Sequence, residues 1–156
     1  MAKVTKLELV VAAASVREQA VAPYSHFKVG AALLTRAGAV ISGANVESAS
    51  YGLTCCAERV ALFKALTEGH REFTAIAVVT GAPGGSMPCG ACRQLLAEYA
   101  PTAQVWVAGV GALRRVREFR VADLLPLAFV KVPASPEEGE ALSKAGAGRA
   151  TLPRSL

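Results

Sequence analysis

The sequence predicts an α/β fold in which helices cover a sheet of about five strands. Segments with the apolar spacing of a helix alternate with short runs rich in strand-forming residues. Their order is helix, hairpin, helix, strand, helix, strand, which is typical of a sheet with helices packed on its faces. The 156 residues are enough for one domain with one apolar core.

The N-terminal part predicts a helix followed by a hairpin. Apolar residues recur at helical spacing over residues 4–20, and Pro23 ends that helix. Residues 27–35 and 40–44 are rich in strand formers, and a turn at Gly38 separates them. We therefore expect these two strands to pair.

The remaining segments complete the sheet and its helices. In chain order we expect an irregular polar segment at 45–54, a helix at 55–68, a strand at 73–80, a loop at 81–88, a helix at 89–99, strands at 104–110 and 116–120, and a turn at 121–125. From Pro133 onward Ala, Gly, Ser, Pro and Glu dominate, so we expect a catalytic domain at 1–132 and a mostly disordered tail at 133–156.

The charge of the chain raises the question of a nucleic-acid partner. The formal net charge is +5, and the densest basic run, at 114–120, holds four arginines. No aromatic platform lies beside this run, so we interpret it as a charged edge strand and do not expect polynucleotide binding. A non-enzymatic zinc module that binds nucleic acid remains the alternative.

Neither a membrane segment nor a secretion signal is predicted. No apolar run approaches the ~18 residues needed to cross a bilayer. The N-terminal residues lack a basic stretch followed by a long apolar one. We expect a soluble cytoplasmic protein.

The four cysteines point to a metal site. Cys89 and Cys92 are three residues apart at the start of a predicted helix, so both thiols can face one ion. Cys56 begins another predicted helix. Three ligands leave one tetrahedral position open, as in catalytic rather than structural zinc sites. Cys55, the remaining thiol, is expected on the helix about 100° from Cys56, as a small core residue.

Charged residues beside these cysteines suggest the chemistry. Glu58 lies two residues after Cys56 and can reach a water molecule at the open zinc position, accept its proton and return it to a substrate. Arg59 is expected to donate a hydrogen bond to a zinc-bound thiolate, whereas Arg93 could do so or face solvent. A structural zinc site would need a fourth ligand, and neither His26 nor His70 is assigned to the metal.

Four motifs, in this order, resemble the cytidine deaminase family and in particular its short, homotetrameric branch. They are PYSHFKVGAAL (23–33), GANVESASYGLTCCAER (43–59), PCGACRQ (88–94) and LLPLAF (124–129). The resemblance implies a three-layer α/β/α fold with a mixed sheet. It also implies zinc-dependent hydrolysis of cytidine and 2′-deoxycytidine to uridine and 2′-deoxyuridine plus ammonia, in pyrimidine salvage.

The same resemblance implies substrate-binding residues. Asn45 and Glu47 would bind ribose hydroxyls, which need both a donor and an acceptor. Phe27 would pack on the pyrimidine, and backbone groups near Ala57 and Pro88 would bind the base edge. The residues alone leave a turn after the strand as the alternative for Asn45, and a strand phenylalanine such as Phe27 is more often a core residue.

Two further aromatic residues are implied in a shared active site. Phe129 would close the site of a neighbouring subunit, and Tyr51 would support the subunit contact. The chain departs from the family pattern at Ser48, Met87 and Leu127, where asparagine, a small polar residue and glycine are frequent. A modified nucleoside such as blasticidin S, or cytosine in a polynucleotide, remains an alternative substrate.

Overall fold

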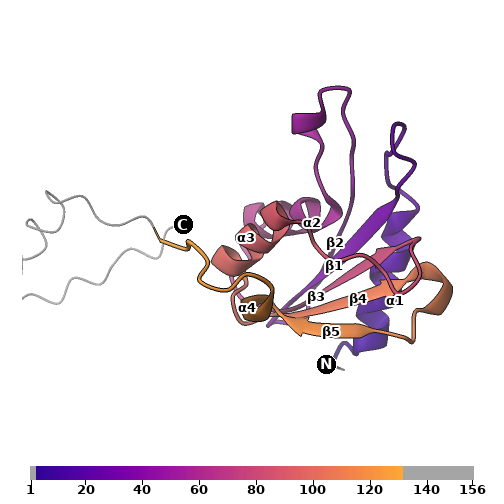
Figure 1. Cartoon of the computed structure of the whole chain (residues 1–156). Coiled ribbons are helices and arrows are strands. Elements are labelled where there is room, and N and C mark those ends of the chain that lie inside the picture. Colours follow the sequence, from indigo (N-terminus) through magenta and orange to yellow (C-terminus); the bar gives the residue numbers. More distant parts are fainter. Residues whose placement is uncertain (1–2, 132–156) are drawn as a thin grey trace, which may run out of the picture.

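The structure, a computed structural model, describes residues 3–131 and contains one five-stranded sheet with the strand order β2-β1-β3-β4-β5 (Figure 1). The strands are β1 (Val29–Thr35), β2 (Val40–Ala44), β3 (Phe73–Thr80), β4 (Gln104–Gly109) and β5 (Arg117–Arg120). The sheet is mixed, because β3 and β4 are parallel whereas the other neighbouring strands are antiparallel. The expected α/β class and strand number are therefore confirmed, and the predicted tail at 133–156 lies outside the described residues.

Helices cover both faces of this sheet (Figure 1). The α-helices are α1 (Lys6–Arg17), α2 (Ala57–Thr67), α3 (Gly90–Tyr99) and α4 (Val121–Leu124), and the 3-10 helices are η1 (Tyr51–Leu53) and η2 (Val110–Ala112). Helix α1 packs on one face, while α2 and α3 lie on the other. The three-layer α/β/α arrangement is confirmed.

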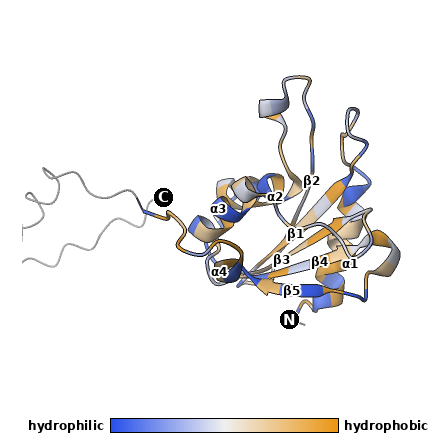
Figure 2. Cartoon of the chain, in the orientation of Figure 1, coloured by the Kyte–Doolittle hydropathy of each residue, from blue (hydrophilic) through white to orange (hydrophobic). Residues whose placement is uncertain are grey.

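The alternation of side chains along β3 explains how one strand serves two cores. Ile76 and Val78 face the core under α2 and α3, whereas Ala77 and Val79 face the core under α1. Both faces of β3 are buried, as the continuous apolar run predicted. Figure 2 shows the contrast with β5, which is mostly hydrophilic and forms an edge of the sheet as expected.

Two glycines let helices approach the sheet closely. A Cβ atom at Gly43 in β2 would lie 2.5 Å from the backbone nitrogen of Ala61 in α2. A Cβ atom at Gly30 in β1 would clash with the carbonyl oxygen of Ala13 in α1. The contact at Gly43 determines how near α2 lies to the strands, and the contact at Gly30 does the same for α1.

Several element boundaries differ from those predicted. Helix α1 begins at Lys6 because the side chain of Thr5 caps it, with Glu8 completing a capping box. The predicted turn at 121–125 contains the short helix α4. Phe27 was expected within a strand, but β1 begins only at Val29, because the turn preceding it is held by side-chain hydrogen bonds.

The segment between β2 and α2 projects away from the sheet and carries η1 (Figure 1). Val46 forms backbone bridges with Val21 and with Cys55. Cys55 was expected on the helix as a core residue, which is wrong: it precedes α2 and is half-buried. Among residues 3–131, no helix is long and apolar enough to cross a membrane.

Candidate active site

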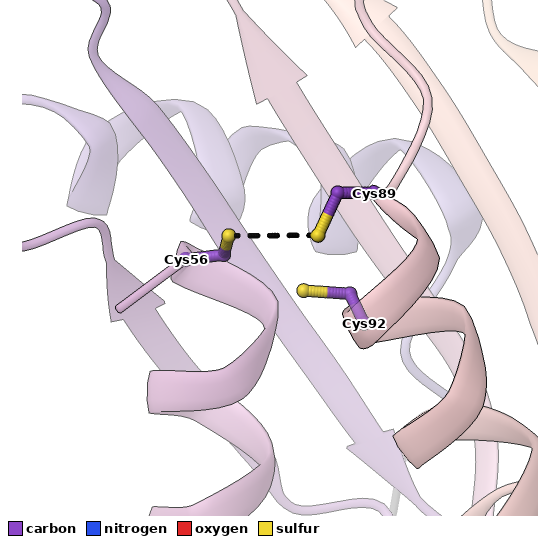
Figure 3. Close-up of side chains that lie close together, drawn as sticks. All are labelled: Cys56, Cys89 and Cys92. Atoms are coloured by element: carbon purple, nitrogen blue, oxygen red, sulfur yellow. Dashed lines mark hydrogen bonds between the residues drawn. The ribbon is translucent and has the colours of Figure 1, made fainter. Parts of the chain in front are cut away.

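Three cysteine thiols meet between the N-terminal ends of α2 and α3 (Figure 3). Cys56 is the N-cap residue of α2, Cys89 is the N-cap residue of α3, and Cys92 lies in the first turn of α3. All three sulfur atoms lie within 4.8 Å of one another. The helices were predicted to begin at residues 55 and 89, but they begin at Ala57 and Gly90, immediately after the N-cap cysteines.

The sulfur geometry fits tetrahedral zinc. Two thiolates bound at about 2.3 Å to one tetrahedral zinc ion lie about 3.8 Å apart. The Sγ atoms of Cys56 and Cys89 are 3.8 Å apart. The thiolate donor set is one that zinc prefers, and the positive ends of two helices favour the ionised sulfurs. These three cysteines could hold zinc and leave one position free for a water or a substrate.

The pKa values of the thiols reflect their mutual contact. A hydrogen bond from the Cys92 thiol, helped by the Arg59 guanidinium and the Cys89 thiol, lowers the pKa of Cys56 to about 5. The same hydrogen bond raises the pKa of Cys92, because Cys92 must keep its proton to donate it. Cys56 therefore ionises more readily than Cys92, and the ionised thiolate is the form that binds a metal.

Glu58 is a buried carboxylic acid beside this cluster. It lies in the first turn of α2, and 5% of its surface is exposed. Burial raises its pKa to about 7, because a charge in this position is poorly solvated. The side chain nevertheless lines the same cavity as Cys56 and Cys89. Glu58 can therefore exchange a proton with a molecule in that cavity near neutral pH.

Arg59 reaches the thiol cluster from α2. Its Nη2 atom donates to the carbonyl oxygen of Thr54 at 2.7 Å and contacts the Sγ atom of Cys56 at 3.8 Å. The guanidinium is therefore in place to share charge with that sulfur. Arg93, for which two roles were open, instead donates to the carbonyl oxygens of Pro88 and Leu124.

A cavity of about 240 Å³ opens beside the thiols. Its walls bring together segments from β1, the projecting segment, α2, β3 and the loop before α3. The lining residues are Ser25, Phe27, Val29, Asn45, Glu47, Thr54, Cys56, Glu58, Val78, Thr80, Ser86, Met87 and Cys89. The structure thus gathers Phe27, Asn45 and Glu47 around one cavity with the cysteines.

The side chain of Asn45 is hydrogen-bonded within the chain. Its Oδ1 atom accepts from the backbone nitrogen of Val29 at 2.8 Å, and its Nδ2 atom donates to the carbonyl oxygen of Phe27 at 2.9 Å. The amide keeps a second N–H and a second lone pair for another partner. The carboxylate of Glu47 accepts from the turn at 24–25 on the other side of Phe27.

Other residues that were expected at the site lie around it rather than in it. Ala57 is fully buried in the first turn of α2 and does not line the cavity. Phe129 is 63% exposed and lies outside the cavity of its own chain, as does Tyr51, which is 77% exposed. Within the described residues, neither His26 nor His70 belongs to the thiol cluster.

Sequence reasoning missed four polar residues of the cavity wall. Thr80 is buried and lies 3.4 Å from Ser86 between hydroxyl oxygens, while Ser25 and Thr54 line the opposite part. Thr80 belongs to an apolar strand, and the others belong to loops, so no local pattern distinguishes them. Ser25 within PYSHFKVGAAL and Thr54 within GANVESASYGLTCCAER were the available signals, because both motifs were already recognised.

Comparison with known proteins identifies the family and the metal. A family model described as "Cytidine and deoxycytidylate deaminase zinc-binding region" matches residues 4–108. This range includes the three cysteines and Glu58. Together with the cluster of three thiols, the match supports Zn²⁺ as the cofactor, with one ion per subunit.

Two relatives illustrate the range of similar sequences. The cytidine deaminase of Halalkalibacterium halodurans is 52% identical over 122 residues, which cover 78% of this chain and 91% of that protein. The blasticidin-S deaminase of Bacillus cereus is 31% identical over 111 residues, which cover 66% of this chain and 77% of that protein.

Solved structures agree with the sequence comparisons. The crystal structure of cytidine deaminase from Burkholderia pseudomallei is similar with a TM-score of 0.78 at 53% identity, covering 81% of this chain and all (100%) of that chain. Cytidine deaminase from Mycobacterium tuberculosis is similar with a TM-score of 0.70 at 38% identity, covering 81% and 98%. With its thiol cluster, its fold and these matches, the chain belongs to the cytidine and deoxycytidylate deaminase family.

Proposed function

We propose that this protein hydrolyses cytidine and 2′-deoxycytidine to uridine and 2′-deoxyuridine, releasing ammonia, in pyrimidine salvage in the cytoplasm. One observation carries the proposal: a cluster of three thiols could hold zinc, and two of them, Cys56 and Cys89, line one cavity with a buried carboxylic acid, an aromatic ring, an amide and a second carboxylate. The thiols and the buried acid can perform a hydrolysis, and the ring, the amide and the second carboxylate can bind a base and a sugar. The relatives named cytidine deaminases support this substrate class.

The proposed chemistry assigns the zinc ligands to Cys56, Cys89 and Cys92. Zinc supplies Lewis acidity, which lowers the pKa of water toward neutrality and makes a nucleophile available. Glu58 accepts one proton of the attacking water and delivers it to the ring nitrogen N3. It then accepts the second proton, from the hydroxyl group added at C4, and delivers it to the amine, so that ammonia leaves and C4 becomes a carbonyl carbon. A carboxyl group whose pKa is raised to about 7 suits both directions of transfer.

Arg59 has a charge-balancing role in this proposal. Three thiolates and one divalent zinc ion carry a net charge of about −1, which weakens Lewis acidity. The Arg59 guanidinium, 3.8 Å from the Cys56 sulfur, withdraws electron density from that thiolate. The hydrogen bond of Arg59 to the Thr54 carbonyl keeps the guanidinium in that position.

The substrate is held by residues on the opposite wall. Phe27 packs on the pyrimidine, the Asn45 amide and the Glu47 carboxylate bind the ribose hydroxyls, and backbone groups near Ala57 and Pro88 bind the base edge. The position of Phe27, Asn45 and Glu47 on one cavity supports this arrangement. A lining that combines an aromatic ring with an amide and carboxylates suits a ligand with a flat base and hydroxyl groups.

The protein is proposed to assemble as a homotetramer with shared active sites. Phe129 lies outside the cavity of its own chain and is largely exposed, which supports a role in closing the site of a neighbour. The exposed apolar residues Tyr51 and Leu53 on the projecting segment support a subunit contact there.

The decisive experiment compares wild-type protein with Glu58→Gln, measuring zinc content and ammonia release from cytidine. We expect the variant to retain zinc and to lose roughly 10²- to 10⁴-fold in turnover, because the proton carrier is gone. Glu68→Gln, an exposed glutamate at the end of the same helix, is the matched control. Normal turnover by Glu58→Gln would contradict the role proposed for Glu58.

A substrate panel tests the nucleoside class. Cytidine and 2′-deoxycytidine are expected to release ammonia, whereas cytosine and adenosine are not. Blasticidin S belongs in the panel because a relative of that specificity is 31% identical. A single-stranded oligonucleotide containing cytosine tests the polynucleotide alternative, and deamination of the oligonucleotide in preference to cytidine would overturn the proposed substrate.

A further inference from the structure

Ser25 occupies a junction between two walls of the cavity. Its hydroxyl donates to one oxygen of the Glu47 carboxylate. The same hydroxyl oxygen accepts from the backbone nitrogen of Phe27 at 3.0 Å. The other Glu47 oxygen accepts from the backbone nitrogens of Tyr24 at 2.9 Å and of Ser25 at 3.2 Å. One side chain therefore links the carboxylate to the backbone that carries the aromatic ring.

The turn that these bonds hold is conformationally unusual. His26, between Ser25 and Phe27, has a φ angle of 55°, which is a left-handed conformation rarely adopted by residues other than glycine. Its backbone nitrogen donates to the carbonyl oxygen of Ala22 at 3.1 Å. A left-handed residue persists where surrounding bonds determine the conformation, and here the bonds come from Glu47 through Ser25.

Phe27 is fixed from its other side as well. The Asn45 amide donates to the Phe27 carbonyl oxygen and accepts from the Val29 nitrogen. The backbone on both sides of the ring is thus tied to a polar side chain of the segment 45–47. Phe27 precedes β1 and so lacks the backbone hydrogen bonds that strands exchange in a sheet. The side-chain hydrogen bonds hold its backbone in their place.

We propose that Ser25 is a positioning residue for the deamination reaction: its hydroxyl couples the Glu47 carboxylate to the Phe27 backbone, so that the sugar-binding acid and the base-packing ring form one prearranged unit. This inference rests on the proposed function of the cavity. Ser25 itself lines the cavity but needs no contact with the reacting atoms. Its effect belongs to substrate binding, whereas Glu58 and the thiols determine the chemical step.

The direct test is Ser25→Ala, assayed for kcat and KM with cytidine. Loss of a hydrogen bond to a charged group predicts a rise in KM of roughly 10-fold, with kcat changed by less than about 3-fold. Ser25→Thr keeps the hydroxyl and is expected to restore KM. Ser25→Cys, which keeps the side-chain size with a weak hydrogen-bonding group, is expected to resemble Ser25→Ala. Ser15→Ala, exposed on α1 and outside the cavity lining, is the control.

A double-mutant cycle tests the coupling through Glu47. If Ser25 acts through that carboxylate, the KM increases of Ser25→Ala and Glu47→Gln are not multiplicative, and the double variant resembles the worse single variant. A purely structural role for Ser25 predicts that the two increases multiply. Multiplying effects, a fall in kcat alone, or an unchanged KM in both Ser25→Ala and Ser25→Cys would overturn the inference.

The result can be separated from failure of the proposed function. Wild-type protein loaded with zinc is assayed on cytidine in the same series. Absence of ammonia release from wild type would contradict the proposed function itself. Normal wild-type turnover with an unchanged KM in the Ser25 variants would contradict only the positioning role. Melting temperatures of all variants show whether a change in KM reflects unfolding.

Discussion

Glu58 combines a cost in stability with the proton-transfer role proposed for it. It is buried in the first turn of α2, and burial is the main cause of its raised pKa. A buried carboxyl group without a cationic partner in direct contact is costly to ionise. Glu58 lines the cavity, and the proposed reaction needs a proton donor and acceptor there.

The raised pKa predicts a pH-dependent stability difference in metal-free protein. Glu58 titrates at about 7 in the folded chain against 4.5 in the unfolded chain, so folding disfavours its ionised form. The folded protein is therefore destabilised progressively as the pH rises from about 4.5 to 7, and the full destabilisation is present above pH 7. Glu58→Gln should therefore be more stable than wild type at pH 8, by about 3 kcal/mol, and of similar stability at pH 4.

Urea unfolding of the chelator-treated proteins at the two pH values measures this difference. Glu68→Gln, which changes an exposed glutamate, should show no such pH dependence relative to wild type. A difference between Glu58→Gln and wild type that is the same at pH 4 and pH 8 would show that the carboxyl group is not perturbed by burial.

His26 makes a second prediction at the residue scale. Its φ angle of 55° is tolerated by asparagine but strained for a β-branched residue. His26→Val should lower the free energy of unfolding by about 1–2 kcal/mol, whereas His26→Asn should change it by much less. Thermal or urea unfolding measures both variants, and equal destabilisation would show that the backbone conformation of this turn is not what the substitution disturbs.

Helix α2 connects the fold to the site at the scale of elements. Its N-terminal end carries Cys56, Glu58 and Arg59, and its position depends on contact with β2. Gly43 in β2 provides that contact by lacking a Cβ atom. A change at the sheet should therefore move the residues proposed to act in catalysis, even though none of their side chains is altered.

Gly43→Ala tests this dependence. Its Cβ atom would lie 2.5 Å from the Ala61 nitrogen and 2.9 Å from the Ala57 carbonyl oxygen, so α2 must shift. We expect the free energy of unfolding to fall by about 1–3 kcal/mol. We also expect weaker zinc retention, because a shift of α2 moves Cys56 relative to Cys89 and Cys92. Gly111→Ala is the control, since a Cβ atom there meets open space. Wild-type stability and zinc content in Gly43→Ala would contradict the tight contact.

At the scale of the whole molecule, several large apolar side chains of the described residues are exposed to solvent. Tyr51, Leu53 and Phe129 are exposed, and Leu127 is 103% exposed in a left-handed conformation with φ of 55°. A glycine at position 127 would adopt that conformation without strain. Exposed apolar groups of this kind are typical of surfaces that bind other subunits.

The proposed tetramer can be tested by substitution at this surface. Tyr51→Asp places a charge where a subunit contact is expected, so the assembly should dissociate and the activity should fall. Light scattering during size-exclusion chromatography measures the mass, and ammonia release measures the activity. Val11→Asp, an exposed apolar residue on α1, is the control. A monomeric wild-type protein with full activity would contradict the shared active site.

Much of this molecule could be predicted from the sequence because the signals are local. Helical geometry within one turn decides which side chains lie near each other at a helix start. This applies to Cys89 and Cys92 at the start of one helix, and to Cys56 and Glu58 at the start of another. The convergence of the two helix ends was inferred from chemistry, since one ion needs all three thiols. The thiol cluster confirms that inference.

The residues that were missed or misplaced depend on contacts between distant segments. Ser25 and Glu47 are 22 residues apart, and nothing in a local pattern indicates that they share a hydrogen bond. Phe27 lies outside β1 because side chains hold its turn, which strand propensity does not describe. Cys55 lies before α2, not within the predicted helix, because its backbone pairs with that of Val46.

By itself, then, the sequence determined the order of elements, the α/β class and the set of groups that could bind zinc and move protons. Apolar periodicity and ligand spacing are properties of neighbouring residues, so they can be read without coordinates. Only the tertiary structure decided the cavity wall, the burial of Glu58 and the linkage of Ser25 to Glu47 and Phe27. Burial and long-range hydrogen bonds arise when separate segments exclude water together, which no single segment specifies.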